Sequence, residues 1–131
     1  MSWVFLSRRV VEAFHAEQLR RHGGAPGLRD ENALESAIGR AENKAAYGDP
    51  DIADLAAAYL FGIARNHAFV DGNKRTAIVS AGGFLDNHGY DLSADNGTLY
   101  EFVVAVASGE IGEEQIAQFF RDHLIPLELE G

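Results

Sequence analysis

One short polar interval concentrates side chains that could carry out phosphate chemistry. It spans residues 67–77, reads HAFVDGNKRTA, and lies between two of the most hydrophobic stretches of the chain. A connection between buried helices ordinarily needs apolar contacts and one helix cap, so a concentration of reactive groups here indicates a functional site. The interval holds an imidazole, a carboxylate, an amide and two cations, on His67, Asp71, Asn73, Lys74 and Arg75.

The helix predicted to begin at about Gly72 offers an anion site. The first N–H groups of a helix have no partner within it, and the helix dipole is positive there, so this end can hold phosphate oxygens. Gly72 lets an anion approach closely, Lys74 adds a compact cation, and Arg75 adds a planar fork for two oxygens. Asn73 can either donate a hydrogen bond to the ligand or fix the loop through its backbone. These residues predict a site for the phosphates of a nucleotide.

Two further side chains add a metal ligand and a base. Asp71 immediately precedes the phosphate donors, and Mg²⁺ in proteins takes one or two carboxylates together with phosphate oxygens. His67 precedes Asp71 by four residues, and an imidazole can take the proton of an attacking hydroxyl at neutral pH. The interval is not a Walker A motif, because the glycine before Lys74 and the leading strand are missing. We therefore expect base, metal ligand and phosphate clamp within one loop.

The elements that position this interval are predicted to be helices. Apolar residues recur at helical spacing in six segments, and no convincing period-two alternation predicts a strand. The expected fold is a single all-α domain over residues 1–131, a bundle of about six helices in which the polar interval 67–77 joins the two most apolar ones. The helical segments are 7–22, 30 to about 47, 51–66, 72 to about 87, 95 to about 108, and a last one through 116–123 that Pro126 ends.

Three other features have simple structural interpretations. The glycine-rich run 23–27 has no preceding strand and no following lysine, so it predicts a plain loop rather than a phosphate cradle. Phe69 is expected to anchor the polar interval in the core. Four histidines lack a metal-binding spacing such as His-Glu-x-x-His, which favours surface or helix-end roles for His15, His22, His88 and His123.

Composition excludes several classes of function. The chain has 131 residues with 11 basic and 20 acidic side chains, a net charge of −9, and no cysteine. Zinc ribbons, iron–sulfur clusters and thiol nucleophiles are thereby excluded, and the acidic balance argues against sequence-independent nucleic-acid binding. No apolar run approaches the ~18 residues that span a membrane. We expect a cytoplasmic protein that binds neither nucleic acid nor membrane.

The interval also resembles the signature of the Fic/Doc superfamily, which is His-x-Phe-x-Asp/Glu-Gly-Asn followed by Gly or Lys and then Arg. The similarity continues in the Gly-Gly loop, in Gly-Leu-Arg-Asp at 27–30 and in Asn-His-Gly-Tyr at 87–90. The small size is typical of the Doc (death on curing) toxins. The resemblance implies an all-α Fic fold in which the signature connects two central helices.

The resemblance further implies a transfer reaction from ATP to a protein hydroxyl. The general family transfers AMP, but its pattern has Gly at the position of Lys74 and a second Arg at the position of Ile78, and this sequence has neither. Doc toxins share Lys74 and transfer the γ-phosphoryl group to a threonine of elongation factor Tu, which arrests translation. Gly72 departs from Doc, where Ala is familiar. AMP transfer and a non-catalytic antitoxin-binding or regulatory module stay open as alternatives.

By the same resemblance, roles follow for each signature residue. His67 is the base toward the target hydroxyl, and Asp71 holds Mg²⁺ and orients the substrate. Doc toxins are encoded beside an antitoxin of the Phd type, which implies a Phd-like partner for this chain. The phosphate site comprises Gly72, Asn73, Lys74 and Arg75.

Overall fold

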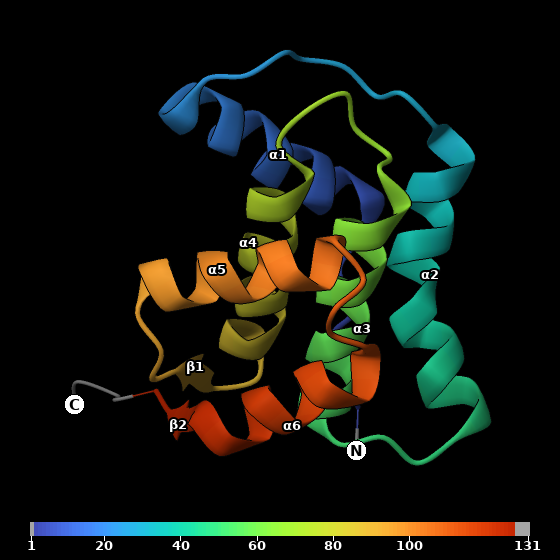
Figure 1. Ribbon diagram of the computed structural model, residues 1–131. Helices are drawn as coiled ribbons and strands as arrows, with labels where there is room; N and C mark the ends of the chain where they lie inside the picture. Colours follow the sequence, from blue (N-terminus) through green and yellow to red (C-terminus); the bar gives the residue numbers. More distant parts are fainter. Residues whose placement is uncertain (1, 128–131) are drawn as a thin grey trace.

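Six helices and a pair of short strands make up the computed structural model, which describes residues 2–127 (Figure 1). The predicted all-α class and the six helices are confirmed, with ends within a few residues of those expected. The elements are α1 (Arg8–His22), α2 (Glu31–Tyr47), α3 (Ile52–Asn66), α4 (Asn73–Asn87), β1 (Tyr90–Leu92), α5 (Asn96–Ala107), α6 (Glu113–His123) and β2 (Leu124–Pro126).

Oxygen-bearing side chains determine where four of the helices begin. Each accepts a hydrogen bond from the backbone N–H three residues later, which satisfies a donor that the first helical turn leaves free. The capping residues are Ser7 for α1, Asp30 for α2, Asp51 for α3 and Asp95 for α5. In contrast, α4 follows Gly72 and has no side-chain cap. Like α6, which follows Gly112, α4 therefore begins without an N-cap side chain bonded to the N–H groups of its first turn.

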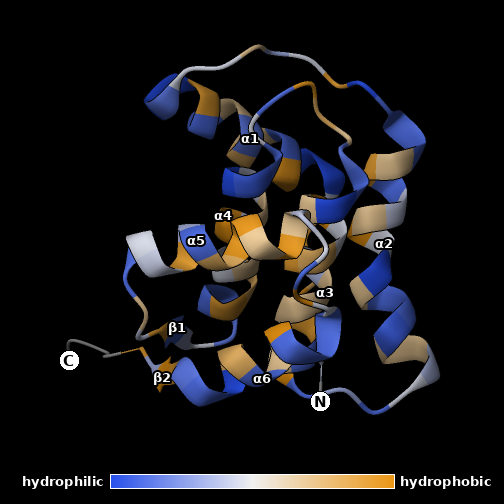
Figure 2. Ribbon diagram, in the orientation of Figure 1, coloured by the Kyte–Doolittle hydropathy of each residue, from blue (hydrophilic) through white to orange (hydrophobic). Residues whose placement is uncertain are grey.

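Helix α3 is the centre of the fold, packed by α2, α4, α5 and α6 (Figures 1 and 2). Most of its residues are buried, including Tyr59, whose hydroxyl accepts a 2.9 Å hydrogen bond from the backbone N–H of Leu6. Burial raises the pKa of Tyr59 to about 12. A Cβ added at Gly62 would lie 3.0 Å from the carbonyl oxygen of Ala37, so this glycine permits close packing of α3 on α2. The predicted central position of the two apolar helices is confirmed for α3 and α4.

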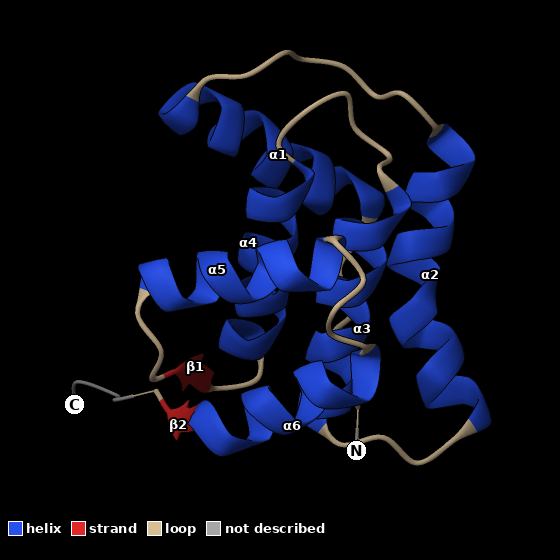
Figure 3. Ribbon diagram, viewed as in Figure 1, coloured by secondary structure: helices blue, strands red, loops and turns tan. Residues whose placement is uncertain are grey.

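The strands β1 and β2 are a correction to the sequence analysis (Figure 3). They pair antiparallel, with Asp91 opposite Ile125, and join the chain after α4 to the chain after α6. Three residues are too few to display an alternation of period two, which explains why the pattern gave no signal. Helix α6 ends at His123, so Pro126 lies within β2 rather than stopping the helix directly.

Ion pairing joins α2 to α6. Glu113, at the start of α6, is hydrogen-bonded by both Lys44 and Arg40 of α2. Burial alone would raise the pKa of Glu113, but the hydrogen bonds from Lys44 and Arg40 outweigh it and hold the pKa below its ordinary value.

Across residues 2–127, no helix has the length and apolar character needed to traverse a bilayer.

Candidate active site

The signature interval forms the connection between α3 and α4, and it lies against the connection between α1 and α2 (Figure 1). The backbone N–H groups of Arg29 and Asp30 donate to the carbonyl of Ala68 at 2.8 and 3.0 Å. In the other direction, Val70 N–H donates to the carbonyl of Gly27 at 3.0 Å. Two loops far apart in sequence are thus held side by side, and residues from α1 reach the signature.

The start of α4 has the geometry of an anion site. Gly72 adopts φ 79° and ψ 12°, a left-handed conformation that glycine reaches without a steric penalty. The N–H groups of the first helical turn, beginning at Asn73, receive no side-chain cap. Uncapped donors and the positive end of the helix dipole favour an anionic ligand here.

The side-chain amide of Asn73 bonds to the loop backbone with both of its polar atoms. Its Oδ1 accepts from the backbone N–H of Phe69 at 3.0 Å, and its Nδ2 donates to the carbonyl of Phe69 at 2.9 Å. Of the two roles left open for this side chain, the structure shows the loop-fixing one. Phe69 itself is only 2% exposed, which confirms its predicted role as a core anchor.

The carboxylate of Asp71 is oriented by backbone groups on both oxygens. Oδ1 accepts from Gly72 N–H at 2.8 Å, and Oδ2 accepts from Ala25 N–H at 3.2 Å. Each oxygen retains a free lone pair, so the carboxylate can still bind a cation. No cluster of three His, Asp or Glu side chains that could hold a metal occurs in the described part of the chain. One carboxylate beside a phosphate site fits Mg²⁺, which takes its remaining ligands from phosphate and water.

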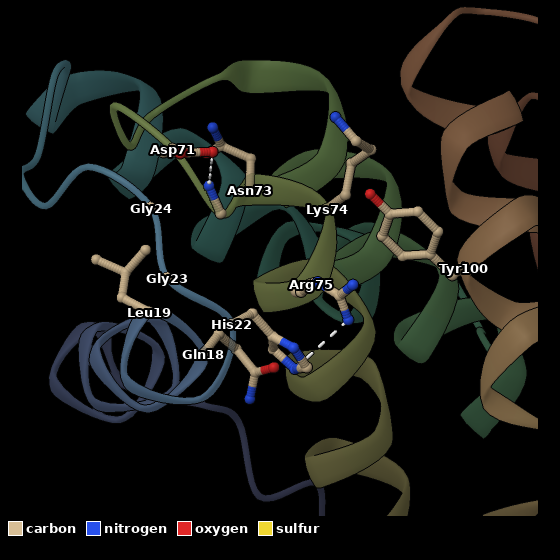
Figure 4. Close-up of a pocket in the computed structure, with 11 residues that line it drawn as sticks. Gln18, Leu19, His22, Gly23, Gly24, Asp71, Asn73, Lys74, Arg75 and Tyr100 are labelled. Carbon is tan, nitrogen blue, oxygen red and sulfur yellow. Dashed lines mark hydrogen bonds between the residues drawn. The ribbon is translucent and has the colours of Figure 1, made fainter.

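A pocket of about 340 Å³ opens at this helix end (Figure 4). Within residues 2–127, neither Lys74 nor Arg75 forms a salt bridge, so their charges are available to a ligand. The guanidinium carbon of Arg75 lies 4.7 Å from the ring centroid of Tyr100, and its Nη1 donates to Nε2 of His22 at 3.4 Å. The pocket is lined by Gln18, Leu19, His22, Gly23, Gly24, Asp71, Gly72, Asn73, Lys74, Arg75 and Tyr100.

His67 is the one predicted site residue that does not line this pocket. It follows α3 as its C-terminal cap, with φ 51° and ψ 44°, and its side chain is exposed. A left-handed backbone at a non-glycine residue is uncommon, and it turns the chain sharply out of α3. The structure therefore brings Asp71 and the phosphate residues together and leaves His67 on the surface at the other end of the loop.

Sequence reasoning missed residues of α1 and of the glycine-rich loop. His15 was expected on the surface or at a helix end, but it is 6% exposed and its Nε2 lies 2.8 Å from the carbonyl oxygen of Asp71. His22 does end α1, and it also lines the pocket. The run 23–27 is a loop, as predicted, and it also wraps the Asp71 carboxylate through Gly24 and Ala25. A usable signal was present, because residues 15, 19 and 22 share one face of α1.

Comparison with known proteins identifies the family. Residues 5–85 match the Fic/DOC family. The matched segment runs from before α1 to the last turn of α4 and includes the whole signature. The chain belongs to the Fic/DOC family. Over 117 residues it is 38% identical to "Protein kinase doc" of Escherichia phage P1, covering 88% of this chain and 92% of that relative. Over 76 residues it is 46% identical to "Toxin Doc" of Mycolicibacterium smegmatis, covering 56% of this chain and 58% of that protein. The resemblance to Doc toxins within the Fic/DOC family is confirmed.

Proposed function

We propose that this chain is a Doc-like toxin that transfers the γ-phosphoryl group of ATP, with Mg²⁺, to a threonine or serine hydroxyl of a protein. The proposed target is elongation factor Tu, whose modification arrests translation. One observation carries the proposal: Asp71, Lys74 and Arg75 surround a single pocket at an uncapped helix N-terminus. The name of the phage relative, a protein kinase, supports the same reaction class.

The pocket residues would bind and orient the phosphates. The N–H groups of the first turn of α4 donate to phosphate oxygens, Lys74 neutralises their charge, and Arg75 holds one of them with its planar fork. Asp71 is the residue that would hold Mg²⁺, which when bound would neutralise charge that develops on the phosphates. The backbone donors from Gly72 and Ala25 keep that carboxylate in one orientation.

His67 would accept the proton of the attacking hydroxyl. The hydroxyl oxygen forms a bond to the γ-phosphorus, the bond from that phosphorus to the β,γ-bridging oxygen breaks, and ADP leaves with the electron pair. The hydroxyl proton passes to the imidazole of His67. An exposed base outside the pocket lining suits a macromolecular acceptor, because a side chain on another protein can reach it without entering a cavity.

In this proposal, a separate antitoxin of the Phd type restrains the enzyme. The reaction is proposed to take place in the cytoplasm. The second relative is named a Doc toxin, and a toxin has to be restrained in the cell that makes it. Copurification of the chain with the product of a neighbouring small gene would test the antitoxin directly.

AMP transfer is the second candidate, and Gly72 favours it because it matches the general Fic pattern. The deciding experiment uses purified protein, Mg²⁺, cell lysate and ATP labelled at either the α- or the γ-phosphate. Label from γ-ATP alone on a protein band supports phosphoryl transfer, and label from α-ATP identifies AMP transfer. If neither position labels a protein, and expression of wild type and His67→Ala affects growth equally, the chain is a non-catalytic binding module.

A further inference from the structure

We propose that His15 is a positioning residue for the phosphate pocket, fixing from α1 the backbone that carries Asp71 and the start of α4. The kinetic part of this inference rests on the proposed transferase function. The structural part rests on contacts of His15 alone. The proposed role does not require His15 to touch the ligand, since His15 does not line the pocket.

Two contacts on one loop define the place of the imidazole. Its Nε2 lies 2.8 Å from the carbonyl oxygen of Asp71, and its ring is stacked on Phe69 with centroids 3.8 Å apart and planes 9° from parallel. A carbonyl oxygen can only accept, so Nε2 carries the proton and His15 is the donor. The ring therefore holds the loop at two points, one through its face and one through its edge.

The hydrogen bond reaches the carboxylate through one rigid unit. The carbonyl of Asp71 and the N–H of Gly72 belong to the same planar peptide group, so fixing one direction fixes the other. That N–H donates to Oδ1 of Asp71 at 2.8 Å. The order of contacts is thus from imidazole to peptide plane to carboxylate. His15 sets the orientation of the peptide plane and hence of the group proposed to hold Mg²⁺.

The same side chain lies under the start of α4. A Cβ added at Gly72 would be 3.6 Å from Nε2 of His15 and 3.3 Å from Cδ2 of Leu19. Gly72 is therefore packed directly above α1. A shift of the imidazole would move the first helical turn, whose donors must match the phosphate oxygens.

Packing alone does not explain a histidine at this position. An apolar ring would stack on Phe69 equally well, and burying an imidazole is unfavourable unless its polar atoms are satisfied. Replacing it by phenylalanine keeps the stack and leaves the Asp71 carbonyl without its donor. Replacing it by glutamine keeps a donor near the position of Nε2 and removes the stack.

The kinetic test compares His15→Phe and His15→Gln with wild type, using labelled ATP and the labelled protein band. For His15→Phe we expect kcat to fall about tenfold, while KM for ATP changes less than ~3-fold, because misorientation affects the transition state more than binding. His15→Gln should recover part of that loss. The matched control is His123→Phe in α6, where the imidazole also lies against a phenylalanine ring, tilted by 34°, and bonds a carbonyl, and it should leave kcat unchanged.

Wild-type kcat in His15→Phe, or no advantage of His15→Gln over His15→Phe, would overturn the positioning role. A structural measurement separates failure of the positioning role from failure of the proposed function. It requires neither enzymatic activity nor a variant. The imidazole ¹H–¹⁵N spectrum of the wild-type chain should show His15 as the Nε2–H tautomer with a proton protected from solvent exchange. The Nδ1–H tautomer, or a freely exchanging proton, would refute the contact even if transferase activity is found.

Discussion

The side-chain amide of Asn73 forms hydrogen bonds with both backbone groups of Phe69, at 3.0 Å to its N–H and 2.9 Å to its C=O. These bonds close a loop of five residues, one end of which is buried in the core and the other end of which begins α4. The amide therefore couples the stability of the core to the shape of the phosphate pocket.

We expect Asn73→Ala to lower the free energy of unfolding by about 1–3 kcal/mol, because two partly buried backbone groups lose their partners. Urea unfolding followed by circular dichroism measures this change. Asn73→Asp is the matched variant, since its carboxylate accepts from Phe69 N–H but cannot donate to Phe69 C=O, and it should fall between wild type and Asn73→Ala. Equal stability of all three proteins would contradict a loop-closing role.

Gly24 is expected to be essential for the pocket, whereas Gly23 is not. Both have positive φ, so an alanine strains the backbone at either position, but only at Gly24 would the new Cβ lie 2.8 Å from Oδ2 of Asp71. No atom lies within 4 Å of the corresponding Cβ at Gly23. Gly24→Ala should weaken binding of Mg²⁺-ATP at least ~10-fold more than Gly23→Ala, measured by isothermal titration calorimetry. Matching affinities in the two variants would show that the loop does not shape the carboxylate.

His67→Ala should separate catalysis from nucleotide binding. Because His67 lies outside the pocket lining, the variant should bind Mg²⁺-ATP with a Kd within ~3-fold of wild type. Loss of the general base should lower transfer to the target protein by about 10²- to 10⁴-fold. Calorimetry and label transfer on the same preparation measure the two quantities. A large loss of ATP affinity would mean that the imidazole contacts the nucleotide.

Acid should weaken the contact between α2 and α6. The pKa of Glu113 is lower in the folded chain than its ordinary value of 4.5, so its contribution to stability is present above pH 4.5 and is lost as the pH falls through the folded pKa. Glu113→Gln should be less stable than wild type by about 1 kcal/mol at pH 7, and this difference should shrink below pH 4.5. Urea unfolding at several pH values between 7 and 3 tests this. A difference that stays constant with pH would exclude the charge of Glu113 as its source.

Much of the fold could be predicted because its signals are local. Caps such as Asp30 and Asp51 bond to N–H groups three residues away, and the apolar character of α3 is visible within its own segment. The signature residues from Asp71 to Arg75 are adjacent in sequence, so a single helix start brings them together.

The unpredicted features depend on pairing across the chain. The shared face of residues 15, 19 and 22 indicates a packed side of α1, but it does not reveal that Asp71 lies against His15, because that contact is made by the packing of α1 on α4. The strands β1 and β2 are recognisable only as a pair, since each has three residues. The exposed position of His67 follows from its left-handed backbone, which helical spacing alone cannot indicate.

Helix α4 is fastened at both ends, by α1 beneath its first turn and by the β1–β2 ladder just beyond its last. A helix held in this way has little freedom to tilt when a ligand arrives. The proposed nucleotide would therefore meet donors already in place, and the protein would lose little conformational entropy on binding it. If the proposed transfer takes place, adjustment during recognition would then fall to the acceptor protein, in a flexible segment that carries the hydroxyl group.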